Sequence, residues 1–557
     1  MRRHDSDGGA RGRILLAVVA TAGIFTLIAG RLVTLGMEPA IAADGPAISP
    51  LDAIQAARPD IIDRNGEVLA TDLATASLYA EPRNIIDVDE AVELLTSVLP
   101  ELDAEGLRAD LSSERGFVWL KREISAQMRE RVHDLGIPGI GFLTETRRFY
   151  PGGSSVGHIV GHVDVDNAGI AGLERSIDAS GLRALQTAGL ARKGRAMAPV
   201  RLSLDLRVQH AVRDELSRAM ERYRAKAAVG IVLDARTLEV MAMSSLPDYD
   251  PNHPSQSLEE KRLNRALTGV FELGSIFKSF TMASALDAGV ISLDSTVDAR
   301  YPLRIGRHTI EDFHAKARWL TVREVFKYSS NIGTAKIAKA LGKTRQQEYL
   351  ERLGMFDRMA TELPEGARPL VPSRWADITA ATVSYGHGMA VTPMHAAAAA
   401  AAILNGGVYA APTFYPRSEA EMQGAGHRVI APETSRQLRE LFYINAQEGS
   451  GRRARVPGYN VGGKTGTAEK ATRGGYSADK RINSFLAAFP IDSPQYVTLV
   501  VLDEPKPEEG QRSATAGLNA APTVANIITR IGPMLAVKPR FDDGDAVTRA
   551  IEVAYQE

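Results

Sequence analysis

Residues 274–289 read GSIFKSFTMASALDAG and predict a helix with a serine and a lysine on one face. Ser275 follows Gly274 at the start of an apolar run, and Gly289 stands where a glycine commonly closes a helix. The spacing i, i+3 places Ser275 and Lys278 side by side. A serine hydroxyl is a weak nucleophile that needs a neighbouring base, so this stretch is a candidate for nucleophilic catalysis.

The Ser-x-x-Lys pattern occurs twice, at Ser275–Lys278 and at Ser477–Lys480, so the pattern alone decides nothing. Ser477 lies among Gly474, Gly475 and Asp479, and we expect a loop there. The helical context therefore favours Ser275 as the nucleophile.

Two further short motifs follow in chain order. The chain has a single Ser-x-Asn, at Ser329-Ser330-Asn331, and a single Lys-Thr-Gly, at Lys464-Thr465-Gly466. The order Ser-x-x-Lys, Ser-x-Asn, Lys-Thr-Gly is typical of the penicillin-recognising serine acyltransferases. Each motif is weak alone, but all three in this order favour acyl transfer strongly.

These residue types suit that chemistry. Lys278 can act as the base if it is neutral, and burial plus a second cation such as Lys464 would lower its pKa. Ser329 can relay a proton to the leaving amine, and Asn331 can hold a substrate amide.

The segment 464–467 is the predicted carboxylate anchor. Lys464 supplies charge and Thr465 and Thr467 supply hydroxyls, with Gly466 in the same substrate-binding segment. The backbone N–H of Ser275, at a helix N-terminus, is a predicted oxyanion donor.

Composition excludes several classes of function. At about 150 residues per domain, 557 residues predict three or four units. Sixty-six Lys and Arg against 67 Asp and Glu argue against binding of nucleic acid by bulk charge. The absence of cysteine excludes disulfides, Cys zinc sites and thiol catalysis. It suits an oxidising compartment, and a cysteine-poor proteome would explain it equally well.

The N-terminus predicts a membrane anchor. Residues 14–30 carry no charge, and continuation to Met37 gives a run long enough to span a bilayer if Arg31 snorkels to the interface. Arginines precede the run and no Lys or Arg occurs from Leu32 to Ala57, so residues 1–13 are expected in the cytoplasm and the body outside. A cleaved signal peptide is the alternative, since Ala40-Ile41-Ala42 matches a cleavage site.

The remaining chain divides by composition. Residues 38–57 contain three prolines among small residues and predict a linker. Residues 58–200 show a mixed pattern with one helix near 89–99, and residues 201–539 alternate between helix and strand. Strands are expected at 230–233, 239–243 and 496–502, and a packed helix at the alanine run 396–402. Residues 540–557 are expected to be a loose tail.

The chain resembles the class B penicillin-binding proteins, and within them the septal type called penicillin-binding protein 3. The resemblance rests on the three motifs and on the following segments: Asp60-Ile-Ile-Asp63-Arg64-Asn65-Gly66, Arg148-Phe-Tyr150-Pro151-Gly152, Gly157-His158-Ile-Val-Gly161, Gly169-Ile-Ala-Gly172-Leu-Glu174, Asn264-Arg265-Ala266, Gly386-His387-Gly388 and Gly462–Ala468. Leu273 stands before Gly274 where the family usually has proline, and Ile276 follows Ser275 where threonine is usual, but neither departure removes a catalytic group. The short gap from Asn252 to Asn264 favours the division enzyme over its cell-elongation relative, which remains the alternative.

The resemblance implies an α/β (α+β) protein. It comprises a single transmembrane helix (14–37), a non-catalytic, elongated pedestal (58–200) and a transpeptidase domain (201–539) with a central antiparallel sheet flanked by helices. It implies that Thr467 supplies the second oxyanion amide, and that the substrates are peptidoglycan stem peptides ending in D-Ala-D-Ala, with β-lactams as acylating inhibitors. It also implies a place in the inner membrane at the division site, beside a membrane glycosyltransferase and other division proteins. We expect no cofactor, metal or nucleic acid.

Five rival interpretations are weaker. Residues 458–465 fit a phosphate-binding loop literally, but no apolar helix can begin at Thr465. His158 and His162 are spaced as a zinc pair, but the glycines around them make a helix unlikely and a third ligand is lacking. A scaffold without catalysis is disfavoured by the complete motif set. Residues 58–200 are too few for a glycosyltransferase domain, and the predicted anchor and pedestal disfavour a secreted carboxypeptidase.

Overall fold

The computed structural model describes residues 58–182, 197–472 and 475–541, together with Thr21, Gly23, Thr26, Val547 and Ile551. The chain divides into two units, residues 1–53 and 54–557. In the first unit the three described residues are helical, and the rest of the predicted span 14–37 lies outside the described residues. Within the described part of the chain, no helix is long and apolar enough to cross a bilayer.

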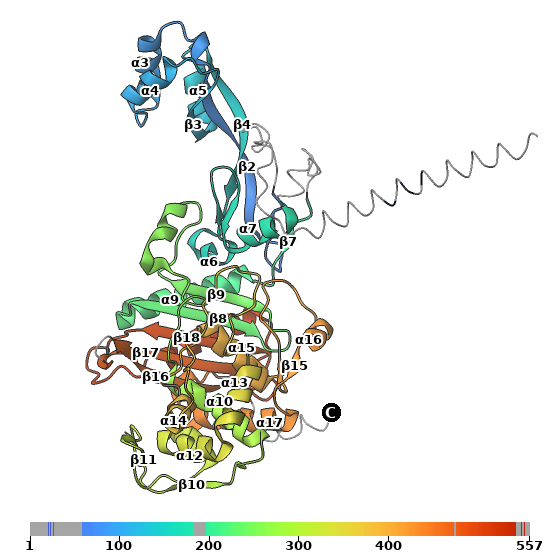
Figure 1. Cartoon of the computed structure of the whole chain (residues 1–557), viewed down its shortest axis with the longest axis vertical. Helices are drawn as coiled ribbons and strands as arrows, with labels where there is room; N and C mark the ends of the chain where they lie inside the picture. Colours follow the sequence, from blue (N-terminus) through green and yellow to red (C-terminus); the bar gives the residue numbers. More distant parts are fainter. Residues whose placement is uncertain are drawn as a thin grey trace, which may run out of the picture. The chain divides into compact units, whose positions relative to one another are not determined.

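The N-terminal part of the second unit has its own sheet and hydrophobic core. Its strands run in the order β3-β2-β1-β7, and β4 pairs with β2 (Figure 1). The strands are β1 (Ile61–Ile62), β2 (Val68–Ala80), β3 (Val118–Ile124), β4 (Ile140–Phe149), β7 (Val200–Arg201) and the separate pair β5 (His162–Val163) and β6 (Gly169–Ala171). The helices are α3 (Val88–Val98), α4 (Ala104–Leu111), α5 (Ala126–His133), α6 (Gly157–Val160) and α7 (Gly172–Ile177). The predicted helix near 89–99 is confirmed by α3.

The predicted pedestal contains a buried cluster of charged side chains. The carboxylate of Glu174 accepts hydrogen bonds from Arg58 Nε at 2.8 Å and from Arg148 Nε at 2.7 Å. These three side chains are at most 1% exposed. Arg148 also pairs with Asp72 at 3.0 Å. Because the charges satisfy one another away from water, the cluster joins β2, β4, α7 and the start of the body.

Close backbone contacts and hydrogen bonds join this part to the C-terminal part. A Cβ on Gly157 would lie 2.3 Å from the carbonyl oxygen of Tyr249, so glycine is required there. The Tyr249 hydroxyl donates to the Gly157 carbonyl at 2.9 Å. The amide of Leu206, the first residue of α9, donates to Asp63 Oδ2 at 3.0 Å.

A five-stranded antiparallel sheet forms the centre of the C-terminal part, in the order β16-β17-β18-β8-β9 (Figure 1). The strands are β16 (Gly462–Thr472), β17 (Gly475–Phe489), β18 (Tyr496–Asp503), β8 (Ala227–Asp234) and β9 (Val240–Leu246). Every residue of β8 and β18 is buried, because helices cover both faces of the sheet. The predicted central antiparallel sheet flanked by helices is confirmed.

The two faces have separate cores. Ala228 and Val232 of β8 pack with α9 (Leu206–Tyr223) and α18 (Ala520–Met534). Val229 and Ile231 pack in the larger core with α10 (Phe277–Asp287), α15 (Pro393–Leu404) and α17 (Pro432–Glu448). The alanine run forms most of α15, and all its residues are buried, since small side chains allow a helix to lie close to a sheet.

The remaining elements surround the sheet and the larger core. The helices are α11 (Val322–Tyr328), α12 (Asn331–Leu341), α13 (Lys343–Arg352), α14 (Asp377–Ser384) and α16 (Glu419–Ala425). Short antiparallel pairs are β10 (Thr296–Asp298) with β13 (Trp319–Thr321), β11 (Leu303–Ile305) with β12 (His308–Ile310), and β14 (Val408–Tyr409) with β15 (His427–Arg428).

Three sequence-based expectations are corrected. Ser477 lies within β17 rather than in a loop, because β17 pairs with β16 as far as Gly475. His158 lies in a single helical turn, α6, which ends where Gly161 takes a φ of +77°. In the predicted loose tail, Val547 and Ile551 are helical, 1% exposed and part of the larger core, and the other residues from 542 to 557 lie outside the described residues.

Candidate active site

Ser275 lies in a tight turn whose first residue, Gly274, must be glycine. A 3₁₀ turn at Gly274–Ile276 leads directly into α10. Gly274 has a φ of +57°, and a Cβ there would lie 2.7 Å from the carbonyl oxygen of Thr467. The turn of Ser275 is thereby held against β16. Gly466 contributes to the same close approach, because its Cβ would lie 2.3 Å from the carbonyl oxygen of Leu273.

The Ser-x-Asn motif lies at the junction of two helices. Ser329 ends α11 in the left-handed region, with a φ of +56°, and Asn331 begins α12. Ser330 caps α12 by accepting from the amide of Gly333, and its hydroxyl donates to Asp312 Oδ2 at 2.7 Å. Ser330 therefore holds the junction between α11 and α12 in place, whereas the side chains of Ser329 and Asn331 contact Lys278.

Lys464 lies on β16, at the edge of the sheet, and is fully buried. Its Nζ donates to Ser329 Oγ at 3.0 Å and lies 5.6 Å from the centre of the Phe326 ring. Two threonines of β16 are held by residues outside the strand. Thr465 Oγ1 lies 2.6 Å from Ser450 Oγ, and Thr467 Oγ1 accepts a hydrogen bond from the amide of Ala516 at 3.2 Å.

One hydrogen-bonded chain connects the three motifs. Lys278 Nζ donates to Ser329 Oγ at 3.1 Å and to Asn331 Oδ1 at 2.8 Å, and it also contacts the carbonyl oxygen of Ser329. The hydroxyl of Ser329 thus lies between the two lysine amines. Ser275 lies three residues before Lys278, in the 3₁₀ turn that leads into α10, and lines the adjoining cavity.

Electrostatics favour a neutral Lys278. Burial lowers the pKa of Lys278 well below its ordinary value, and the charge of Lys464 lowers it further, while Asp312 acts in the opposite direction. Burial also lowers the pKa of Lys464, to about 7. An unprotonated amine beside a serine can accept the proton that the hydroxyl loses during attack. The low pKa of Lys464 is a feature that its sequence motif did not predict.

The predicted site residues share a cavity of about 590 Å³. Ser275, Ser329, Asn331, Thr465 and Thr467 line it, and Lys278 and Lys464 lie beneath them. His387 and Glu469 line the same cavity. A space of this size accommodates the end of a peptide. All the predicted side chains except the backbone-only Gly466 therefore meet around one cavity.

Three contributors escaped the sequence reasoning. Asp312 and Ser450 act on site residues from 15 to 18 positions away, with no motif of their own. His387 belongs to a segment already quoted for the resemblance, Gly386-His387-Gly388, and that glycine pair was the available signal. Its Nδ1 is buried without a partner among the described residues.

The structure disfavours the rival sites. Lys480, the partner of Ser477 in the second Ser-x-x-Lys, is exposed and so lacks the burial that would make it a neutral base. Residues 462–472 form one strand, so Lys464-Thr465 does not begin a helix as a phosphate loop requires. His158 Nε2 donates to the Arg262 carbonyl at 2.7 Å. Among the described residues, no group of His, Asp and Glu is arranged to hold a metal ion.

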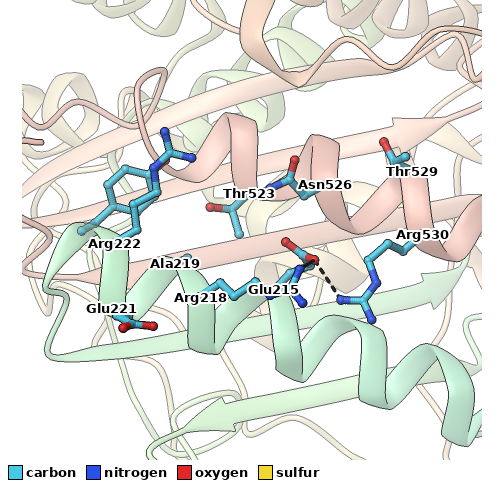
Figure 2. A pocket seen from close by; sticks show the side chains of 10 residues that line it. Glu215, Arg218, Ala219, Glu221, Arg222, Thr523, Asn526, Thr529 and Arg530 are labelled. Atoms are coloured by element: carbon cyan, nitrogen blue, oxygen red, sulfur yellow. Dashed lines mark hydrogen bonds and ion pairs between the residues drawn. The ribbon is translucent and has the colours of Figure 1, made fainter.

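A separate cavity of about 560 Å³ lies between α9 and α18 (Figure 2). Its three arginines and Glu215 form ion pairs with one another or with near neighbours. Arg530 contacts Glu215 at 2.8 Å, as Figure 2 shows, and Arg222 contacts Glu508 at 2.6 Å. This cavity is therefore an ion-paired interface between two helices.

Fold and site together define a serine acyltransferase. The penicillin-binding protein transpeptidase domain matches residues 228–529, and the penicillin-binding protein dimerisation domain matches residues 53–184. The chain belongs to this family, as a class B penicillin-binding protein.

Curated relatives and solved structures agree with this assignment. The chain is 40% identical over 501 residues to the probable peptidoglycan D,D-transpeptidase FtsI of Caulobacter vibrioides, covering 88% of this chain and 83% of the relative. It is 30% identical over 475 residues to the peptidoglycan D,D-transpeptidase FtsI of Escherichia coli, covering 81% and 80%. A crystal structure of penicillin-binding protein 3 from Mycobacterium tuberculosis, complexed with aztreonam, superposes with a TM-score of 0.66 at 25% identity, covering 87% and 98%.

Proposed function

We propose that the protein is a peptidoglycan D,D-transpeptidase of septal cell wall, which cross-links stem peptides through an acyl-enzyme on Ser275 and is acylated there by β-lactams. The observation that carries this proposal is the chain of contacts from buried Lys278 through Ser329 to Lys464, beside a cavity that Ser275 lines. The FtsI relatives, which are named D,D-transpeptidases, support the reaction class.

Acylation begins with attack of Ser275 Oγ on the carbonyl carbon of the penultimate D-alanine. Neutral Lys278 accepts the hydroxyl proton, and the amides of Ser275 and Thr467 stabilise the oxyanion. The close packing of Gly274 against the Thr467 carbonyl supports this pair of oxyanion donors, because it holds the turn of Ser275 beside the Thr467 backbone. The C–N bond then breaks, and Ser329, between the two lysines, carries a proton to the leaving amine of D-alanine.

Substrate binding uses the other side of the cavity. Lys464, Thr465 and Thr467 bind the terminal carboxylate, and Asn331 holds the upstream amide, with Gly466 allowing the backbone to lie close. Carboxylate binding restores the charge of Lys464, because an opposite charge raises the pKa of a buried amine.

The reaction is tested with a donor peptide ending in D-Ala-D-Ala and a peptide acceptor with a free amine. The full-length protein in detergent should release D-alanine and form the donor–acceptor adduct, both measured by mass spectrometry. Ser275→Ala should do neither. Release of D-alanine without any adduct at saturating acceptor would identify a carboxypeptidase instead.

We also propose that residues 14–37 anchor the protein in the inner membrane, with 1–13 cytoplasmic, 38–57 a linker, 58–200 a pedestal, 201–539 the catalytic domain and 540–557 a short C-terminal segment. The arginines before the apolar run support this orientation. N-terminal sequencing of the mature protein should find residues before Ala43, whereas a start at Ala43 would show a cleaved signal peptide.

The division role and its partners form part of the same proposal. The relatives named FtsI favour septal work at the division site over cell elongation. Residues 53–184 match a dimerisation domain and residues 228–529 a transpeptidase domain, and neither makes glycan, so we propose a membrane glycosyltransferase and other division proteins as partners. Depletion should block septation and produce filaments, while depletion that gives round cells would assign the elongation role.

A further inference from the structure

A second cavity adjoins the catalytic cavity. It has a volume of about 1070 Å³ and follows the segment between α17 and β16. Arg452 and Arg453 line both cavities, so the two spaces meet at these side chains. Arg455 and Asn460 line the second cavity alone. We call this second cavity the arginine groove.

The arginine groove offers positive charge without a matching carboxylate. Arg452, Arg453 and Arg455 are exposed, and none of them forms an ion pair with any carboxylate of the described residues. The side-chain nitrogen of Asn460 is buried and lacks an acceptor within the described part of the chain. Glu448, which also lines the groove, is paired with Lys327. Guanidinium groups match carboxylates in geometry as well as charge, so this lining favours an anionic ligand.

The groove opens at one particular end of the catalytic cavity. Ser450 precedes Arg452 by two residues and contacts Thr465 at 2.6 Å, so the arginines lie at the Thr465 end of β16. Glu469 lines the same cavity four residues along the strand, which is about 13 Å at roughly 3.3 Å per residue. The Thr465 end is the end at which the terminal carboxylate of the donor is proposed to bind.

We propose that the arginine groove binds the carboxylates of the acceptor peptide, an inference that rests on the transpeptidation proposed above. After acylation, the released D-alanine leaves the Thr465 end empty. The acceptor amine approaches the ester carbonyl from that vacated side, and the rest of the acceptor extends past Ser450 over Arg453 and Arg455. The new C–N bond forms, the C–O bond to Ser275 breaks, and the amine proton returns to Ser275 Oγ through Lys278.

Competition between water and amine for one acyl-enzyme tests this inference. The full-length protein in detergent is acylated with a benzoyl-D-alanyl thioester. The acceptor is an acetylated peptide with one side-chain amine and two carboxylates, compared with the same peptide carrying both carboxylates as amides. The ratio of aminolysis to hydrolysis products is measured by mass spectrometry. This ratio does not depend on the rate of acylation, because both products arise from the same intermediate.

The parent should prefer the dicarboxylate acceptor by about threefold to tenfold, as expected for a few partly exposed charge contacts. The pair Arg453→Gln and Arg455→Gln should lose that preference, and Arg453→Lys with Arg455→Lys should keep part of it. The matched control Arg345→Gln, an exposed arginine on α13, should keep it fully. Equal partition for both acceptors in the parent, or a preference that survives in the double glutamine variant, overturns the inference. Absence of any acyl-enzyme in the parent instead refutes the proposed function.

Discussion

Replacement of Lys464 by alanine should slow acylation by an anionic β-lactam more than a hundredfold. Lys464 is fully buried, its Nζ donates to Ser329 Oγ at 3.0 Å, and it lies beside the cavity in which the carboxylate is proposed to bind. The variant loses the charge that binds the carboxylate and the charge that helps keep Lys278 neutral.

The magnitude follows from those contacts. A hydrogen bond to a charged group contributes about 1.5–3 kcal/mol, and Lys464→Ala removes two such contacts, one to Ser329 Oγ and one to the bound carboxylate. The loss is therefore on the order of 3 kcal/mol or more, and each 1.4 kcal/mol or so is a factor of about ten in rate. Thr465→Ala removes one neutral hydroxyl and should cost less. Lys464→Arg keeps the charge on a bulkier group and should recover part of the rate.

The assay is the second-order rate of acylation by benzylpenicillin, measured on the purified full-length protein in detergent. Lys470→Ala is the matched control, because Lys470 lies on the same strand but pairs with Asp503 and Glu504 at 2.8 Å. Acylation of Lys464→Ala at the parental rate would show that the carboxylate-anchor role is wrong and that Lys464 only supports the fold.

Two further predictions concern pH and stability. The second-order acylation rate should fall in acid, as Lys278 becomes protonated, and should also fall above about pH 7 as Lys464 loses its proton, since its pKa is about 7. Lys464→Arg should remove the alkaline fall, and a fall that persists in that variant would assign it to another group. Glu174→Ala should lower the free energy of unfolding by about 3–5 kcal/mol in urea titrations, because it removes the buried carboxylate that Arg58 and Arg148 share. A change within about 0.5 kcal/mol, as for an ordinary surface substitution, would contradict the reasoning.

The central sheet and its helices could be predicted from local patterns, because the order of apolar residues along a segment indicates which of its faces are buried. The strand at 227–234 is apolar on both faces, as a strand between two helical layers must be. The alanine run forms a helix because nothing in it opposes one. The glycines near Ser477 predict a loop, but pairing with β16 extends β17 through this residue, and that pairing cannot be seen in the local sequence.

The candidate site was predictable to the extent that its chemistry lies in short motifs. Ser275 and Lys278 are joined by helical spacing, but their proximity to Ser329 and Lys464 depends on three elements that meet only in the fold. Ser450 and Asp312 could not be found from sequence, because a single serine or aspartate in a connecting segment has no distinctive spacing. The pKa of Lys464 could not be found either, because burial of a particular amine is a property of tertiary packing.

The most direct test of the account is the position of the penicillin adduct. The full-length protein is incubated with benzylpenicillin, its intact mass is measured, and the modified peptide is mapped. One adduct should appear, on Ser275, and it should persist in Ser477→Ala and vanish in Ser275→Ala. An adduct on Ser477, or one that survives in Ser275→Ala, would contradict the assignment of the nucleophile and with it the mechanism.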